Sequence, residues 1–183
     1  MTFLFLEKRV PYLVASTYDD VFHYINIFQK GWVTMFRENV AALIKYQDKY
    51  LACFRSDHKT WQNVQGGIEK TDKSPLHAII RETKEELGVH ENDFKIIYKS
   101  IYWRRYFFPK EILKKERFKG NIGQEQLWFL IELKSFNSIK LENSVGEFQK
   151  VDLFTIEKFL STYSKWKLPA FHDFCRELEL VKL

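Results

Sequence analysis

The chain has 183 residues, of which 45% are hydrophobic, 17% aromatic and 29% charged, and its formal net charge is +5. This composition excludes an intrinsically disordered protein and is sufficient for one folded domain with a sizeable core. The modest positive charge favours anionic partners. Cys53 and Cys175 are the two cysteines, and their apolar surroundings predict buried thiols rather than a disulfide or a metal site.

Residues 1–33 contain no motif that carries chemistry, and we expect them to form an extension packed on the main domain, residues 34–183. The segment at 21–28 is compatible with a short helix or a strand. An apolar run at residues 1–6 is followed at once by three charged residues, so it is too short for a signal peptide or a membrane span. We therefore expect a soluble cytoplasmic protein without membrane contact.

Hydrophobic patterning predicts an α/β fold for the rest of the chain. Strands are expected at residues 39–46, 50–54, 93–103, 124–133 and 147–154. Helices are expected at residues 75–87, 156–163 and 168–180. Helices alternating with strands in this way are typical of an α/β/α sandwich around a central mixed β-sheet.

The helix expected at residues 75–87 has clear signals at both ends. Ser74 is a suitable N-cap, Pro75 suits the first helical position, and Gly88 is the residue type expected just past the helix end. Its boundaries are therefore predicted more sharply than those of the other elements.

Three carboxylates share one face of this helix, because Glu82, Glu85 and Glu86 are spaced at i, i+3 and i+4. Like charges at this spacing repel one another. A hard divalent cation relieves the repulsion, since Mg²⁺ takes oxygen ligands and shares them readily with phosphate. The alternative is a solvated acidic face, which is the usual meaning of a charge run.

The glycines that flank these residues favour the cation. The stretch Gly67–Val89 resembles the Nudix box, G-x5-E-x7-R-E-U-x-E-E-x-G-U, in which U is a bulky aliphatic residue. The matching positions are Gly67, Arg81, Glu82, Glu85, Glu86, Gly88 and Val89. Lys73 stands where the box has its first glutamate, and Thr83 stands where it has an aliphatic residue. In the family that glutamate pairs with the motif arginine, and here Asp72 is the candidate partner of Arg81.

Further segments resemble bacterial RNA pyrophosphohydrolases and the related diadenosine polyphosphate hydrolases. They are Arg37-x-Asn39-Val40, Trp61-Gln62-x-x-Gln65-Gly66-Gly67-Ile68, Trp103-x-Arg105-Tyr106-x-x-Pro109-Lys110 and Ile122-Gly123-Gln124-x-Gln126-x-Trp128-Phe129. The resemblance implies a Nudix hydrolase that removes pyrophosphate from 5′-triphosphorylated RNA and leaves a 5′ monophosphate. It also implies Mg²⁺ as the cofactor, with Mn²⁺ as a substitute, and an RNA 5′ end or a nucleoside polyphosphate as the partner.

The same resemblance implies roles for individual residues. The implied metal-binding residues are Glu82, Glu85, Glu86 and Gly66. The implied catalytic residues are Glu85, Glu86 and Glu147, with the base left open between Glu85 and Glu86. The implied substrate-binding residues are Arg37, Arg55, Tyr106, Gln124, Phe171 and His172. Arg37 and Arg55 would contact phosphates and Phe171 would stack on a base, while His172 stands where the family has a lysine. A position in the core is the alternative for Phe171.

Residues 104–119 hold seven basic residues against two acidic ones, with aromatic residues interleaved. This pattern suits RNA, because cations bind phosphates and aromatic faces stack on bases. The alternative is a solvated loop whose aromatic side chains fill the core beneath it. Three functions remain open: an RNA 5′ pyrophosphohydrolase, a hydrolase of diadenosine polyphosphates or other small nucleotides, and an RNA- or nucleotide-binding module with weakened catalysis.

Overall fold

The structure is a computed structural model, and it describes residues 11–13, 35–55, 57, 59–114 and 120–181. The strands are β1 (Pro11–Leu13), β2 (Met35–Tyr46), β3 (Lys49–Arg55), β4 (Thr60–Gln62), β5 (Val64–Gly67), β6 (Phe94–Phe107), β7 (Asn121–Leu133) and β8 (Lys150–Phe154). The α-helices are α2 (Pro75–Leu87), α3 (Lys110–Leu113), α4 (Ile156–Thr162) and α5 (Leu168–Glu177). Short 3₁₀ turns occur at Glu91–Asp93, Phe136–Ser138 and Leu141–Asn143.

Within the described part of the chain, the strands form one mixed β-sheet. Its main order is β1-β6-β7-β2-β3-β4, while β5 pairs with β2 and β8 pairs with β3. The two central strands, β2 and β7, run parallel over most of their length, and most of the other pairs are antiparallel. The sheet is therefore built around a long parallel pair that joins distant parts of the sequence.

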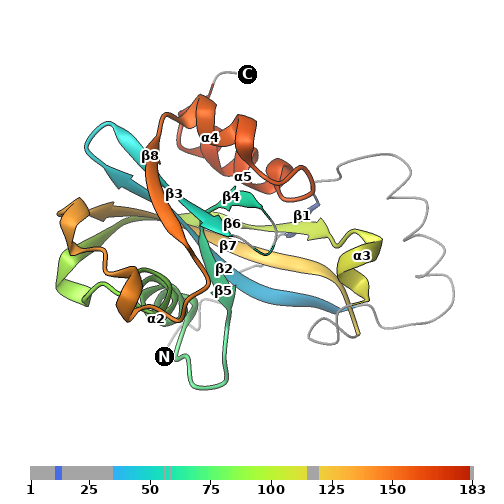
Figure 1. The fold of residues 1–183 in the computed structure, drawn as a ribbon. Helices are drawn as coiled ribbons and strands as arrows, with labels where there is room; N and C mark the ends of the chain where they lie inside the picture. The colour runs from blue at the N-terminus through green and yellow to red at the C-terminus, as the bar shows by residue number, and fades with distance from the viewer. Residues whose placement is uncertain (1–10, 14–34, 56, 58, 115–119, 182–183) are drawn as a thin grey trace, which may run out of the picture.

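Helices cover both faces of this sheet, with α2 on one side and α4 and α5 on the other (Figure 1). Each side has its own hydrophobic core. Val40, Ile79 and Phe129 belong to the core under α2, and Leu43, Trp128 and Phe174 belong to the core under α4 and α5. This arrangement confirms the predicted α/β/α sandwich. No helix among the described residues is long and apolar enough to cross a membrane.

The structure also corrects several predicted boundaries. β6 continues four residues beyond the predicted end, to Phe107. β8 begins at Lys150, so Glu147 lies in the preceding loop rather than at the start of a strand. β4 and β5 are absent from the predicted set, which treated residues 61–65 as the entry to a loop. Of the predicted extension, residues 1–33, only β1 is described, and it pairs with β6 in parallel; the segment at 21–28 lies outside the described residues.

Candidate active site

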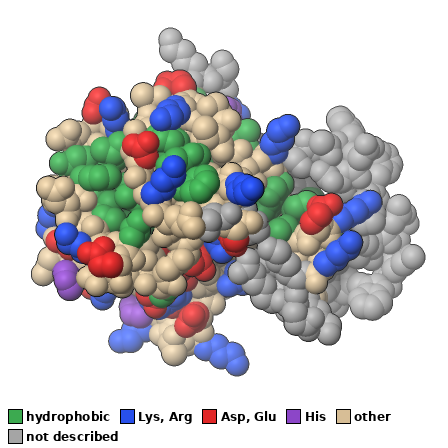
Figure 2. Space-filling view, viewed as in Figure 1, with side chains coloured by type: hydrophobic (Ala, Val, Ile, Leu, Met, Phe, Trp, Pro, Cys, Tyr) green, Lys and Arg blue, Asp and Glu red, His purple; other side chains and the backbone are tan. Residues whose placement is uncertain are grey.

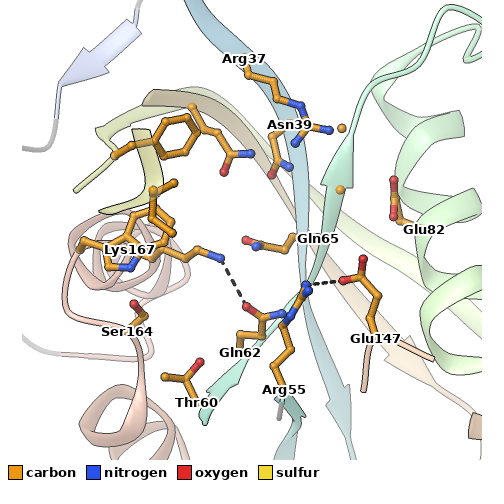
Figure 3. A pocket seen from close by; sticks show the side chains of 16 residues that line it. Arg37, Asn39, Arg55, Thr60, Gln62, Gln65, Glu82, Glu147, Ser164 and Lys167 are labelled. Carbon is orange, nitrogen blue, oxygen red and sulfur yellow. Dashed lines mark hydrogen bonds and ion pairs between the residues drawn. The ribbon is translucent and has the colours of Figure 1, made fainter. Parts of the chain in front are cut away.

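A cavity of about 350 Å³ opens between the ends of β2, β4, β5 and β7 and the segment that leads into α5. Figure 3 shows its charged and polar wall, in which arginine, glutamine and glutamate side chains point towards one another. The polar and charged lining residues are Arg37, Asn39, Arg55, Thr60, Gln62, Gln65, Glu82, Gln124, Glu147, Ser164 and Lys167. Phe108, Ile112 and Trp166 form an apolar wall, and Gly66 and Gly67 complete the lining. One cavity therefore combines carboxylates, guanidinium groups and an aromatic surface.

The predicted acidic helix, α2, forms with the predicted boundaries. The Ser74 hydroxyl accepts a hydrogen bond from the backbone N–H of His77 at 3.2 Å, which caps the first turn. Gly88 ends the helix with φ of 64°, a left-handed conformation that favours glycine. Thr83, which replaces the aliphatic residue of the box, is fully buried and donates its hydroxyl to the carbonyl of Ile79 at 2.7 Å. That departure therefore leaves the buried hydroxyl satisfied.

Arg81 is held by Asp72, as predicted from the neighbouring departure at Lys73. The Asp72 carboxylate is inaccessible to solvent, and it accepts hydrogen bonds from Nε and Nη2 of Arg81 at 3.2 and 2.9 Å. It also accepts the backbone N–H of Glu69 at 2.8 Å. Hydrogen bonding from Arg81 is the main reason why the pKa of Asp72 lies well below its usual range. The guanidinium in turn donates to the carbonyl of Gly67 at 2.9 Å, so this pair fixes the loop onto the helix.

Glu82 lies against Gly66, and a side chain at position 66 would displace its carboxylate. A Cβ atom added to Gly66 would lie 1.9 Å from the carboxylate carbon of Glu82. Arg81 donates to Glu82 Oε1 at 2.8 Å. Burial nevertheless outweighs this contact and raises the pKa of Glu82. The Glu82 carboxylate and Gly66 therefore line the cavity side by side.

Glu86 is the most buried carboxylate of the three, with 2% of its surface exposed. Its Oε2 accepts the backbone N–H of Gln65 at 3.0 Å, which ties α2 to β5. Burial, and then the nearby charges of Glu147 and Glu82, raise the pKa of Glu86 well above its usual range. Negative charge is thus concentrated where it is least stable in the absence of a cation.

Glu147 reaches the same region from the loop before β8. Its carboxylate forms an ion pair with Nη1 of Arg55, whose Nε and Nη2 donate to the two Asp57 oxygens at 2.8 and 3.0 Å (Figure 3). The loop is attached to the end of α2, because the N–H of Lys140 donates to Leu87 O at 2.9 Å. The N–H of Val145 likewise donates to Glu85 O at 2.9 Å. These bonds fix the position of Glu147 relative to the helix.

The structure does not bring Glu85 into the cavity. Its side chain is 44% exposed and accepts a hydrogen bond from Nη1 of Arg81 at 2.9 Å. Among the described residues, no group of three or more His, Cys, Asp or Glu side chains is already arranged to hold a metal ion. The physical reason is that Arg81 lies between Glu82 and Glu85 and bonds to both. The predicted convergence of three helical carboxylates is therefore wrong for this arrangement.

The donor chemistry of the site still fits a divalent cation. Burial raises the pKa values of Glu82 and Glu86, the charge of Glu147 contributes to both, and the charge of Glu82 also raises the pKa of Glu86. A bound cation relieves such repulsion, and Mg²⁺ prefers carboxylate and carbonyl oxygens. Gly66 has no side chain, so the Glu82 carboxylate can lie directly against the backbone of β5. The cavity wall thus supplies hard oxygen donors and excess negative charge.

Three of the predicted substrate-binding residues line the cavity, and a fourth supports it. Arg37 lies against Gly67, where an added Cβ would be 2.1 Å from its Nη2. Arg55 and Gln124 also line the cavity. Tyr106 is 1% exposed and donates its hydroxyl to the Gln124 side chain, so it holds Gln124 from behind.

The roles predicted for Phe171 and His172 are contradicted. Phe171 has no exposed surface and is stacked on Trp128 in the core, with ring centroids 5.4 Å apart. No face of its ring is available to a base, so the core alternative is correct. His172 is exposed and does not line the cavity.

An aromatic and basic pair does reach the cavity, but it lies five residues earlier. Trp166 is half-buried and forms part of the apolar wall. Lys167 is 9% exposed, and its Nζ donates to Gln62 Oε1 at 3.3 Å (Figure 3). The Nε2 of Gln62 is buried without a hydrogen-bond partner in the described part of the chain. The signal that was missed is an aromatic and basic pair in the loop just before Pro169, a position where binding residues concentrate.

The basic segment at 104–119 is partly structural. Arg104 is 1% exposed and pairs with Asp173 and Glu177 of α5. Phe108 is 1% exposed and packs against Trp166, with ring centroids 6.0 Å apart. In this portion the aromatic residues fill the core, as the alternative predicted, whereas residues 115–119 lie outside the described part of the chain.

Comparisons with known proteins address the family and the fold of the chain. A sequence model of the NUDIX domain matches residues 35–174. The chain is 36% identical over 99 residues to an RNA pyrophosphohydrolase of Thioalkalivibrio sulfidiphilus, which is 54% of this chain and 57% of that protein. It is 38% identical over 116 residues to an RNA pyrophosphohydrolase of Francisella philomiragia, which is 62% of this chain and 74% of that protein. Among the first such relatives, the chain spans 51% to 66% of their length.

Solved structures share the fold at low sequence identity. The E. coli dihydroneopterin triphosphate pyrophosphohydrolase matches with a TM-score of 0.59 and 16% identity, over 75% of this chain and 94% of that one. A C. elegans Ap4A hydrolase matches with a TM-score of 0.55 and 17% identity, over 77% of this chain and 98% of that one.

Proposed function

Because the chain belongs to the Nudix family, we propose that it is a Mg²⁺-dependent pyrophosphohydrolase that removes pyrophosphate from 5′-triphosphorylated RNA and leaves a 5′ monophosphate. The observation that carries this proposal is the cavity itself, in which Glu82 and Glu147 face Arg37 and Arg55 beside the Trp166 ring. A triphosphate with its Mg²⁺ ion requires carboxylates to hold the cation and guanidinium groups to bind the phosphate oxygens. The base of a nucleotide requires an aromatic surface on which to stack. The similarity to RNA pyrophosphohydrolases supports RNA as the source of that triphosphate.

In the proposed enzyme, Glu82, Glu86, Glu147 and the carbonyl of Gly66 would hold Mg²⁺. When bound, the ion would neutralise phosphate charge and lower the pKa of a coordinated water molecule. Arg37 and Arg55 would bind the phosphate oxygens that the ion does not reach. Arg55 already pairs with two carboxylates, so substrate must compete with Asp57 and Glu147 for its donors.

Glu86 is the residue that we assign as the base. Its Oε2 is fixed by the backbone N–H of Gln65, which leaves Oε1 for the ion or for the proton of a water molecule bound to it. Glu85 is less suited, because it is exposed and paired with Arg81 outside the cavity. The structure therefore favours one of the two residues that the sequence left open.

The far end of the cavity would bind the first nucleotides. Trp166 offers an aromatic face, and Lys167 and the unpaired Nε2 of Gln62 offer hydrogen-bond donors to a base or phosphate. A buried donor without a partner is costly, so a ligand acceptor at this position would be stabilised.

The decisive experiment is a substrate panel, run with Mg²⁺ and with chelator. We expect Mg²⁺-dependent release of pyrophosphate from 5′-triphosphorylated RNA, with much slower turnover of diadenosine tetraphosphate. Faster turnover of the dinucleotide would favour the second hypothesis, a small-nucleotide hydrolase. Tight RNA binding without turnover of any substrate, with Mg²⁺ or with chelator, would favour a binding module.

A further inference from the structure

A lysine beside the cavity is held in place by two aromatic rings. Lys150 is the first residue of β8 and is exposed. Its Nζ lies 4.9 Å from the centroid of the Phe54 ring and 5.2 Å from that of the Trp61 ring. The two rings meet edge to face, with centroids 5.2 Å apart. Contacts of this kind restrict the side chain of a lysine while its charge stays in water.

Strand register explains why these three residues lie together. Phe54 on β3 is paired with Lys150 on one side and with Trp61 on the other. Directly paired residues in antiparallel strands share one face of the sheet. We therefore call Lys150, Phe54 and Trp61 the Lys150 row. In the space-filling view, hydrophobic side chains gather on the face around β8, with Lys and Arg side chains lying across them (Figure 2).

The Lys150 row adjoins the cavity wall along β3 and β4 but lies on the other face of these strands, because successive side chains of a strand point to opposite faces. Trp61 stands between Thr60 and Gln62 in β4, and both of these residues line the cavity. Arg55, which follows Phe54 in β3, lines it as well. β4 ends the main order of the sheet, and Trp61 is bridged there to Tyr163, so a polymer leaving the cavity would reach the row by passing around this end of the sheet. Neighbouring positions along a strand are only about 3.3 Å apart.

We propose that the Lys150 row binds the single-stranded RNA that continues beyond the cavity, with the Lys150 ammonium group contacting a backbone phosphate downstream of the 5′ end. This inference rests on the proposed function and extends it. Cations and aromatic surfaces are the means by which proteins bind single strands without sequence preference. A dinucleoside polyphosphate has no downstream backbone to place there, so the row would favour RNA over small nucleotides.

The test compares two lengths of 5′-triphosphorylated RNA, a dinucleotide and an unstructured dodecamer. Lys150→Met removes the charge but keeps an apolar stem over the rings, and Lys150→Arg keeps the charge. We expect Lys150→Met to lower kcat/KM for the dodecamer roughly two- to fivefold, since single exposed charge contacts are weak. The value for the dinucleotide should be unchanged, and Lys150→Arg should behave as the wild type.

Salt dependence gives a second readout. Loss of one phosphate contact should flatten the plot of log affinity against log salt for the dodecamer by about 0.7, the value for single strands. This is measured by anisotropy of a dodecamer with a 3′ fluorophore, in chelator, so it does not require turnover. The matched control is Lys95→Met, because Lys95 is exposed near the start of β6, at the end opposite Tyr106 and the cavity. It should change neither slope nor kcat/KM.

Two outcomes would overturn the inference. One is equal affinity of the wild type and Lys150→Met for the dodecamer. The other is an equal loss of kcat/KM on the dinucleotide and the dodecamer, which would indicate damage to the cavity rather than loss of a downstream contact. A wild type that hydrolyses neither RNA would overturn the proposed function, whereas the row would still be decided by the anisotropy measurement.

Discussion

Replacing Asp72 by asparagine tests whether the loop before α2 depends on the ion pair with Arg81. The carboxylate is inaccessible to solvent and accepts two guanidinium bonds and the N–H of Glu69. Asparagine keeps one acceptor but brings an amide N–H group towards the guanidinium. Loss of a charge-assisted hydrogen bond costs about 1.5–3 kcal/mol. We therefore expect Asp72→Asn to lower the free energy of unfolding by about 2 kcal/mol.

That loss corresponds to a decrease in Tm of roughly 4–8 °C for a chain of this size, measured by thermal unfolding with chelator present. Asp48→Asn, in the exposed turn between β2 and β3, is the matched control and should leave Tm unchanged. The pH dependence of this stability difference tests the direction of the pKa shift of Asp72. Because the folded-state pKa of Asp72 is depressed, its contribution is present above its ordinary pKa of about 4 and is lost as pH falls through the lower folded value.

The difference in Tm between Asp72→Asn and the wild type should thus be constant near neutral pH and shrink only in acid. Turnover should fall as well, because Arg81 also holds the Gly67 carbonyl and Glu82. A variant with unchanged Tm and unchanged kcat would refute the reasoning that Asp72 compensates for Lys73. Lys73→Glu alone should not raise Tm, since Lys73 is exposed and Arg81 already has its partner.

Other substitutions test the remaining assignments. Glu86→Gln should reduce turnover at least about 100-fold, and Mg²⁺ should raise the Tm of the wild type but not of this variant. In chelator the Tm of Glu86→Gln near pH 7 should exceed that of the wild type, because glutamine removes a buried charge. The raised folded-state pKa of Glu86 stabilises the wild type only when the pH falls through that pKa and the carboxylate becomes protonated; a lower Tm of the variant near pH 7 would contradict this. Gly66→Ala should raise the Mg²⁺ concentration needed for half-maximal activity at least about tenfold, because its Cβ collides with Glu82; an unchanged requirement would exclude that contact from metal binding. Trp166→Ala should raise the KM for RNA by about tenfold and also lower Tm, because Trp166 packs against Tyr106 and Phe108. Phe171→Ala should cost roughly 3–5 kcal/mol of stability in denaturant unfolding without a comparable rise in KM; the reverse pattern for KM would restore the original assignment.

Local signals account for the parts of the fold that the sequence predicted well. The bounds of α2 follow from Ser74, Pro75 and Gly88, each of which acts within one turn of the helix end. The layered architecture follows from the alternation of strands and helices. The carboxylates at positions 82 and 86 both contact β5 for the same reason, since helical spacing puts them on one face of α2.

Non-local packing accounts for the errors. β4 has only three residues, and its pairing with β3 depends on contacts that local patterning cannot reveal. Glu85 is drawn away by Arg81, whose other partner Asp72 lies in the preceding loop. The family resemblance implied that Phe171 stacks on a base. Its burial instead depends on which face of α5 meets the sheet, and Phe171 lies on that buried face. Trp166 and Lys167 reach the cavity because the chain turns there before α5 begins.

The attachment of the residue 140–147 loop to the end of α2 has a consequence for how this molecule can change. The loop that carries Glu147 is joined to the acidic helix by two backbone hydrogen bonds on one side of the sheet. Trp166 and Lys167 come instead from the segment between α4 and α5, on the opposite side. We therefore expect substitutions in that segment to change the nucleotide preference while Glu147 and the carboxylates of α2 keep their arrangement.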